Sequence, residues 1–429
     1  YGIADLFNSY VYLIIPLVSL MLDQGLFRFL IECRDDEERQ SNLLVTVLLV
    51  NIVEILIYGV IYVLIQPYIN SEFKIFLFID VALNILLNTF MQFARGIGKN
   101  GAYALASFLS ASMIVVSNVV TLVVLKMGAW GLFISTVVGR GLSLVVLALV
   151  LKCWRYIGIG KLSKTELIKL LKYSLPFIPN QLSWWVIGVS DRTIISWFLN
   201  VAENGIYSVA NKFSSIYITF YNIFNLSWTE SVSLHINDDD AKEFLSTTIN
   251  TLFSLFFSVC VGIIAYMPFV FQLLINEKYN KAYNQVPILM LAVLFQVIVG
   301  LYSVIYVALK KSTEIAKTSF WAAVINIGVD VLLIKFIGLY AASISTLIAY
   351  ATMTIYRYFH IRKYIVIPLE NKFRYLVIAI IVCVSYYLNN FILDIVTAIV
   401  VTIYAIISNR EIICDTLKMI LQKSKLVRK

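Results

Sequence analysis

Long blocks of apolar residues with few or no charges dominate the sequence. Residues 102–125 carry no charged side chain, and residues 43–65 carry a single one. A helix needs about 20 apolar residues to cross the hydrocarbon core of a bilayer, so blocks of this length predict membrane-spanning helices. The composition agrees, because 14% of the residues are charged, against about 25% in soluble domains. Membrane β-barrel strands alternate apolar and polar residues over about ten positions, and these blocks do not.

These blocks predict an all-α integral membrane protein. The expected spans are residues 3–22, 43–65, 75–93, 102–125, 129–151, 173–198, 205–228, 244–275, 283–309, 318–334, 339–356, 375–388 and 391–407.

Lysine and arginine are divided very unevenly between the two sets of connecting loops. Cytoplasmic loops of membrane proteins carry an excess of these residues. One set of loops, together with the C-terminal tail, holds 26 of the 34 basic residues. We therefore expect that set, which includes the connector at residues 153–172, to be cytoplasmic. Within the connector, Ser163 and Glu166 fit a capping box, and residues 162–172 combine an apolar stripe with lysines. This pattern predicts either an interfacial helix on anionic membrane lipids or a solvated linker with a helical start. The opposite loops hold five basic residues, Lys74, Lys126, Lys278, Lys281 and Lys335.

The sequence contains an internal repeat. Residues 128–136 (GAWGLFIST) are echoed by residues 338–346 (GLYAASIST), and the Gly2-Ile3 helix start is echoed by Gly205-Ile206. Parallel repeats of this kind are known in transporters. We therefore expect two parallel six-helix lobes plus two C-terminal helices, with a first helix of about 20 residues missing ahead of Gly2.

The repeat gives the predicted domain boundaries. Residues 1–152 form the N-terminal lobe without its first helix, and residues 153–172 form the cytoplasmic connector. Residues 173–363 form the C-terminal lobe, and residues 364–429 hold the extra helix pair and a basic tail.

Two charges lie at the middle of predicted spans in the first lobe, Glu54 and Arg140. A charge at the bilayer centre costs about 2.5–3.5 kcal/mol on insertion scales, so it is informative. The two residues either neutralise each other, or serve transport separately. In the second case Arg140 faces a cavity as a contact for an anionic head group, and Glu54 is a candidate ion-coupling site.

The second lobe presents a similar choice at the hairpin of residues 173–198 and 205–228. Asp191 and Lys212 lie level with each other, so they form an ion pair or act separately, as an ion-coupling candidate and a substrate-binding cation. Arg192 is one residue further, about 100° around the helix, so it cannot point the same way as Asp191. It is the preferred cavity cation.

Four further charged residues lie nearer the ends of predicted spans. Asp80 and Asp330 either hydrate or cap locally near the outer ends, or take part in ion coupling. Arg28 and Arg95 lie at the cytoplasmic mouth. They either follow the positive-inside rule or recruit an anionic substrate head group.

The start of the second half carries a recognisable motif. It reads SLPFIP at residues 174–179, SDRTII at 190–195 and GIYSVANK at 205–212. With these residues the chain resembles the Wzx-type polysaccharide and O-antigen flippases of the multidrug/oligosaccharidyl-lipid/polysaccharide exporter superfamily, over nearly its whole length. The residue after Trp228 is Thr229, where relatives often carry proline.

The resemblance implies two lobes around a central cavity and alternating access. It also implies a polyprenyl-diphosphate-linked oligosaccharide as substrate, moved across a bacterial cytoplasmic membrane for O-antigen, lipopolysaccharide or capsule synthesis. A polysaccharide polymerase and a chain-length regulator are the implied protein partners.

Two rival functions remain open at this point. A drug or cation exporter of the same superfamily would share the fold and favour carboxylates in its cavity. A membrane-embedded polysaccharide enzyme would usually need a long exposed loop or a histidine within a helix, and His235 and His360 both fall in predicted loops. The short loops and the repeat also argue against an enzyme, so we expect no enzymatic activity. The five cysteines show no metal-ligand spacing, so we expect no metal, and we expect no cofactor or nucleic-acid partner.

Overall fold

The computed structural model describes residues 2–69, 71–368, 372–415 and 418. These residues are mostly helical, and no strand occurs among them. Much of the predicted basic tail, from residue 419 onward, lies outside the described residues. The chain divides into two compact units, Tyr1–Trp185 with Lys310–Lys317 (unit 1) and Val186–Leu309 with Thr318–Lys429 (unit 2).

Unit 1 is a helical bundle in which α6 packs against both α4 and α5. Stacked aromatic rings from different helices fill its core, with the ring centroids of Phe76 and Phe133 5.1 Å apart. Its elements are α1 (Gly2–Val18), α2 (Leu22–Leu30), η1 (Ile31–Cys33), α3 (Glu37–Ile65), η2 (Gln66–Tyr68), α4 (Lys74–Gly96), α5 (Asn100–Asn118), the π-helical η3 (Val119–Val124), α6 (Ala129–Leu151), α7 (Cys153–Ile159) and α8 (Lys164–Ser174).

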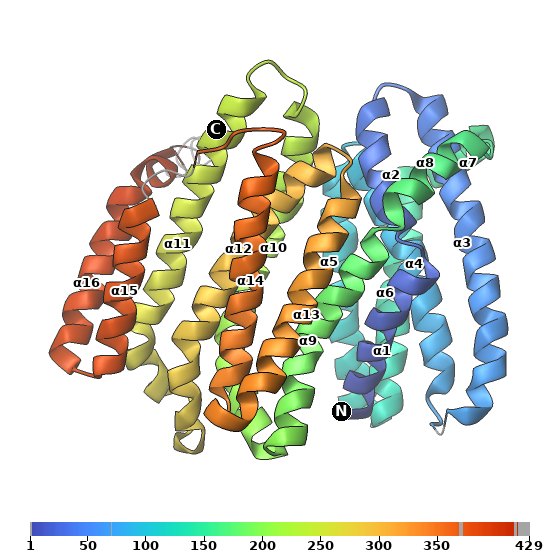
Figure 1. Cartoon of the computed structure of the whole chain (residues 1–429). Coiled ribbons are helices and arrows are strands. Elements are labelled where there is room, and N and C mark those ends of the chain that lie inside the picture. The colour runs from blue at the N-terminus through green and yellow to red at the C-terminus, as the bar shows by residue number, and fades with distance from the viewer. Residues whose placement is uncertain (1, 70, 369–371, 416–417, 419–429) are drawn as a thin grey trace, which may run out of the picture. The chain divides into compact units, whose positions relative to one another are not determined.

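Unit 2 is built around α12, in which 16 of 23 residues are buried and which packs against α10, α11 and α14. The last two helices, α15 and α16, stand beside α11 (Figure 1). The elements are α9 (Phe177–Phe198), of which residues 186–198 belong to this unit, α10 (Val201–His235), α11 (Ala241–Leu274), η4 (Glu277–Gln285), α12 (Val286–Ala308), α13 (Ser312–Ile337), α14 (Tyr340–Ile361), α15 (Lys372–Leu388) and α16 (Phe391–Ser408).

Within the described residues, eight helices are long and apolar enough to cross a membrane, and a ninth span is formed if one bent pair is counted. The chain is therefore a multi-pass membrane protein. Predicted spans at α9, α10 and α14 fall outside this set; each of these helices contains charged residues. The predicted span at α15 also falls outside it, because this apolar helix has 17 residues.

The first predicted span is not a single straight helix. The prediction of one helix over residues 3–22 is wrong, because α1 ends at Val18 and α2 begins at Leu22 with a 60° bend between them. Leu20 and Met21 have φ angles of 47° and 54°, a left-handed conformation that breaks the helical hydrogen-bond ladder. In membrane proteins such irregular backbone is tolerated where it is buried in protein or lines a cavity.

Both copies of the stronger repeat motif start a helix in the same way. Gly128 and Gly338 have φ angles of 58° and 57°, and α6 and α14 begin within two residues of them. Side chains other than glycine adopt this conformation rarely, which explains the glycine in both copies. In the weaker pair, α1 has Gly2 as its first described residue, but Gly205 does not start a helix. The helix α10 begins at Val201 instead, because Asn200 caps it by accepting a hydrogen bond from the backbone N–H of Glu203 at 2.8 Å.

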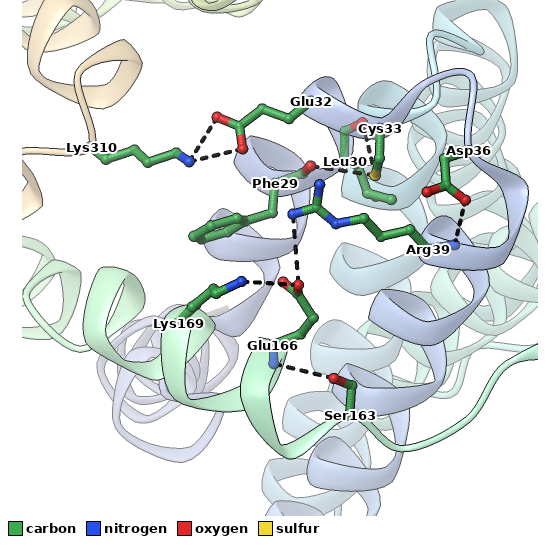
Figure 2. Close-up of polar contacts among 10 residues, drawn as sticks. All are labelled: Phe29, Leu30, Glu32, Cys33, Asp36, Arg39, Ser163, Glu166, Lys169 and Lys310. Carbon is green, nitrogen blue, oxygen red and sulfur yellow. Dashed lines mark hydrogen bonds and ion pairs between the residues drawn. The ribbon is translucent and has the colours of Figure 1, made fainter.

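The connector contains the predicted helix, α8, and half of its predicted capping box. The Ser163 hydroxyl accepts a hydrogen bond from the Glu166 backbone N–H at 3.3 Å, whereas the Ser163 N–H donates to Thr46 at 3.0 Å. The Glu166 carboxylate instead forms ion pairs with Lys169 and Arg39 (Figure 2). The lipid contact expected of this helix stays a prediction.

Candidate functional site

Four helices of unit 2 bring together a buried polar cluster, which we call the carboxylate site. Its members are Asp191 on α9, Tyr207 on α10, Asn326 and Asp330 on α13, and Thr346 on α14. Asn326 and Asp330 are four residues apart, so they share one face of α13. All five side chains are buried, and Asn326 and Asp330 are fully so.

Hydrogen bonds satisfy part of this cluster. One carboxylate oxygen of Asp191, Oδ2, accepts from the Tyr207 hydroxyl at 2.6 Å and from the Thr346 hydroxyl at 2.8 Å. The Asn326 amide donates to Thr346 at 3.2 Å. Within the described residues, Asp191 Oδ1 and both carboxylate oxygens of Asp330 have no hydrogen-bond partner.

The unpartnered oxygens indicate what this site can do chemically. A buried carboxylate is costly unless a cation, a proton or a donor compensates it. Carboxylate, amide and hydroxyl oxygens together form a donor set that suits a hard cation, and two interacting carboxylates can also share a proton. No group of three or more His, Cys, Asp or Glu residues that could hold a metal occurs among the described residues. The oxygen atoms that are present suit a cation or a proton.

Two predictions about this region are corrected. The proposed Asp191–Lys212 ion pair is wrong, because Asp191 is buried among hydroxyl donors while Lys212 is exposed. Of the two alternatives for Asp330, local hydration or capping is wrong, because the residue is 0% exposed; its part in ion coupling stays a prediction. The prediction that Asp191 and Arg192 point in different directions is confirmed, since Arg192 is exposed.

Sequence reasoning missed Tyr207, Asn326 and Thr346. Two signals could have identified Asn326 and Thr346. Asn326 precedes Asp330 by four residues in a predicted span, and Thr346 ends the repeated motif. A polar residue repeated at one helix position in both halves is a candidate for a shared structural or binding role.

In unit 1, Arg140 on α6 forms an ion pair with Asp80 on α4. The predicted pairing of Arg140 with Glu54 is therefore wrong, as is the expectation that Asp80 only hydrates or caps locally. The physical reason is that α6 packs directly against α4, so Asp80 is the carboxylate that Arg140 reaches. Asp80 also lines a cavity of about 220 Å³. The expected role of Arg140 as a head-group contact stays a prediction.

Glu54 on α3 is 7% exposed, and neither of its carboxylate oxygens has a hydrogen-bond partner among the described residues. A second cavity of unit 1, of about 300 Å³, lies at the break between α1 and α2; we call it the amide pocket. Asp23 lines the amide pocket and interacts electrostatically with the Glu54 carboxylate. Its other polar lining residues are Ser19, Gln24, Asn51, Asn84, Asn88, Thr89 and Gln181.

Arg28 and Arg95, the predicted mouth cations, are buried within unit 1. Arg28 donates to Glu32 at 3.0 Å, and Arg95 donates to Gln92 and lies 4.3 Å from the centroid of the Phe27 ring. Both are engaged with the protein, and their recruitment of a head group stays a prediction.

The turn between α12 and α13 also belongs to unit 1. Its Lys310, at a φ of 57°, reaches Glu32 with N–O distances of 2.7 and 2.8 Å, and its ammonium lies 4.5 Å from the Phe29 ring centroid (Figure 2). Glu32 thus joins two basic residues from distant parts of the sequence. The contact docks the 310–317 segment on α2 and η1.

The comparisons agree with this architecture. A family model described as "Polysaccharide biosynthesis protein" matches residues 7–284. No curated protein matches the sequence.

Several solved structures share the fold. A multidrug resistance MATE family transporter of the MOP superfamily, in an outward-facing conformation, matches with a TM-score of 0.70 and 15% identity, covering 84% of this chain and 86% of that one. A MOP superfamily transporter from Pyrococcus furiosus matches at 0.67 with 13% identity, covering 83% and 86%. The MATE transporter ClbM, in complex with Rb⁺, matches at 0.66 with 18% identity, covering 87% and 92%. The two-lobed, all-helical fold is thus confirmed.

Proposed function

Because the chain belongs to the polysaccharide biosynthesis protein family, we propose that it is a flippase. It moves a polyprenyl-diphosphate-linked oligosaccharide across the bacterial cytoplasmic membrane by alternating access. The lipid tail stays in the bilayer while the polar head crosses a hydrated path, so the protein has to offer polar groups to sugars and cations to the diphosphate.

The amide pocket is the observation that carries this proposal. Asn51, Asn84 and Asn88 lie on α3 and α4 and line this pocket. The amides of Asn51 and Asn84 each donate one hydrogen bond inside the protein, to the Thr89 hydroxyl at 2.7 Å and to the Asp80 backbone carbonyl at 2.8 Å. An amide also has a second N–H and a carbonyl oxygen, which suit sugar hydroxyls. Burying polar side chains inside a membrane protein is expensive, so polar walls at this depth point to a polar substrate.

Two exposed cations of unit 2 are the candidates for the diphosphate. Arg192 on α9 and Lys212 on α10 are both exposed, and neither has an ion-pair partner among the described residues. Arginine binds phosphate oxygens bidentately, which favours Arg192. Arg192→Ala should impair transport more than Arg192→Lys, which keeps the charge.

We assign ion coupling to the carboxylate site. Binding of a cation or proton there offsets one of the two negative charges of Asp191 and Asp330 and joins α9, α13 and α14, so its occupancy biases the packing of unit 2. The Rb⁺ bound to one structural neighbour supports cation binding as a property this fold can host. Asp80 is a weaker coupling candidate, because it is already paired with Arg140. Glu54, whose buried carboxylate oxygens have no hydrogen-bond partner among the described residues, is a second candidate.

Export of a cationic drug is the second candidate function. It is favoured by one observation: Asp23 is the single charged residue among those lining the amide pocket. Deletion of the gene distinguishes the two functions. A flippase leaves lipid-linked repeat units in the cytoplasmic leaflet and removes surface polysaccharide, whereas a drug exporter leaves export normal and raises drug sensitivity.

A further inference from the structure

A third cavity lies in unit 2 where the end of α11, η4 and the end of α15 meet. Its volume is about 760 Å³, within the range of small-molecule sites. Lys278 and Lys281 of η4 belong to the sparsely basic loops, so this end of the unit is the outer side. The cavity shares no residue with the carboxylate site or the amide pocket.

One wall of this outer pocket is a set of tyrosine rings fixed in place. The rings of Tyr283 and Tyr386 are stacked with centroids 4.3 Å apart. The hydroxyls of Tyr386 and Tyr387 donate to the backbone carbonyls of Tyr283 and Asn284, each at 2.8 Å. Tyr387 remains 47% exposed, so it offers a ring to a ligand. A ring already held by the backbone loses little conformational freedom on binding.

The rest of the lining is rich in exposed amides. Within the described residues, none of these amide side chains forms a hydrogen bond, so their donors and acceptors are available. The lining contains one carboxylate, Glu277, and neither lysine nor arginine. The pocket is therefore unsuited to a phosphate or an acidic sugar. The amide residues are Gln272, Asn280, Asn284 and Asn389.

We propose that this outer pocket binds neutral sugar residues of a glycan on the outer side of the membrane. The apolar face of a pyranose ring stacks on Tyr387, and its hydroxyls bond to the amides, which match hydroxyls as both donors and acceptors. The inference goes beyond translocation, because it adds a glycan-binding site outside the membrane path. Free sugars test it independently of flipping.

The experiment measures binding of free trisaccharides to the full chain in lipid nanodiscs by saturation-transfer NMR and calorimetry. The probes are triacetylchitotriose and cellotriose, which are neutral, and trigalacturonic acid, which is acidic. Both neutral probes should bind, and the acidic probe at least tenfold more weakly. Tyr387→Ala should lower neutral binding about tenfold, whereas Tyr387→Phe, which keeps the ring, should stay within about twofold of wild type.

Two controls keep this test decisive. Tyr356→Ala removes another tyrosine that is 47% exposed, on α14, and should leave binding unchanged. The double variant Gln272→Ala/Asn280→Ala, on the exposed rim, tests the amides without touching the stacked rings. The proposal is overturned if neither neutral probe binds, if the acidic probe binds more tightly, or if both Tyr387→Ala and the double variant bind like wild type.

Discussion

The Arg140–Asp80 ion pair gives a stability prediction whose size follows from burial. The side chains of Arg140 and Asp80 are 14% and 9% exposed. Replacing Arg140 with methionine leaves the Asp80 carboxylate without its cation. Breaking a buried pair in this way costs about 3–5 kcal/mol. Because Asp80 lines a cavity of about 220 Å³ that water can enter, we expect the lower end, about 3 kcal/mol.

The double variant Asp80→Asn/Arg140→Met removes both charges and should lie within about 1 kcal/mol of wild type. The assay is a double-mutant cycle of the free energy of unfolding, measured by SDS titration in mixed micelles. A coupling energy of about 2 kcal/mol or more is expected from these values. If Arg140→Met is as stable as wild type, or if the two single effects simply add, the buried pair does not hold α4 to α6.

Three further predictions concern other parts of the chain. Asp330→Asn should abolish the dependence of transport on an imposed ion gradient without unfolding the protein, and an unchanged gradient dependence would remove the carboxylate site from coupling. Gly25→Ala should lower the free energy of unfolding by about 1–3 kcal/mol, because the added Cβ would meet Ser174 and Leu170 of α8. The control Gly101→Ala places its Cβ in open space and should not lower stability. Equal melting temperatures of the two variants would contradict this prediction. For Arg192, equal wild-type transport in Arg192→Ala and Arg192→Lys would exclude it from substrate binding.

The membrane helices could be predicted from the sequence because bilayer thickness sets the length of an apolar block. Helix ends were less predictable. The predicted span of residues 339–356 ends before Arg357, but α14 continues to Ile361 and buries Arg357 completely. It donates to the backbone carbonyl of Val299 at 3.0 Å and to Thr318 at 2.7 Å. These hydrogen bonds take the place of water around the buried guanidinium, and a hydropathy pattern contains no information about them.

The sequence predicted which single residues belong to the candidate sites, but not which residues interact with each other. Depth along a helix can be counted, so Arg140 and Asp191 were identified as intramembrane charges. Their partners depend on which helices touch and how each is rotated, and the sequence pattern contains neither. Arg140 therefore pairs with Asp80, and Asp191 bonds to Tyr207 instead of Lys212.

The break between α1 and α2 was also unpredictable, because Leu20 and Met21 are ordinary apolar residues that adopt a left-handed conformation. Glycine or asparagine would have signalled it. Since the amide pocket lies at this break, the cavity itself could not be inferred from the sequence.

Translocation by the purified chain tests the central claim most directly. A fluorescent polyprenyl-diphosphate oligosaccharide is placed in proteoliposomes, and an impermeant quencher reports which leaflet holds the head group. We predict that the label moves between leaflets faster than in protein-free liposomes, and that Arg192→Ala slows this movement. Movement at the protein-free rate, together with uptake of a cationic dye by the same proteoliposomes, would contradict the flippase and identify a drug exporter.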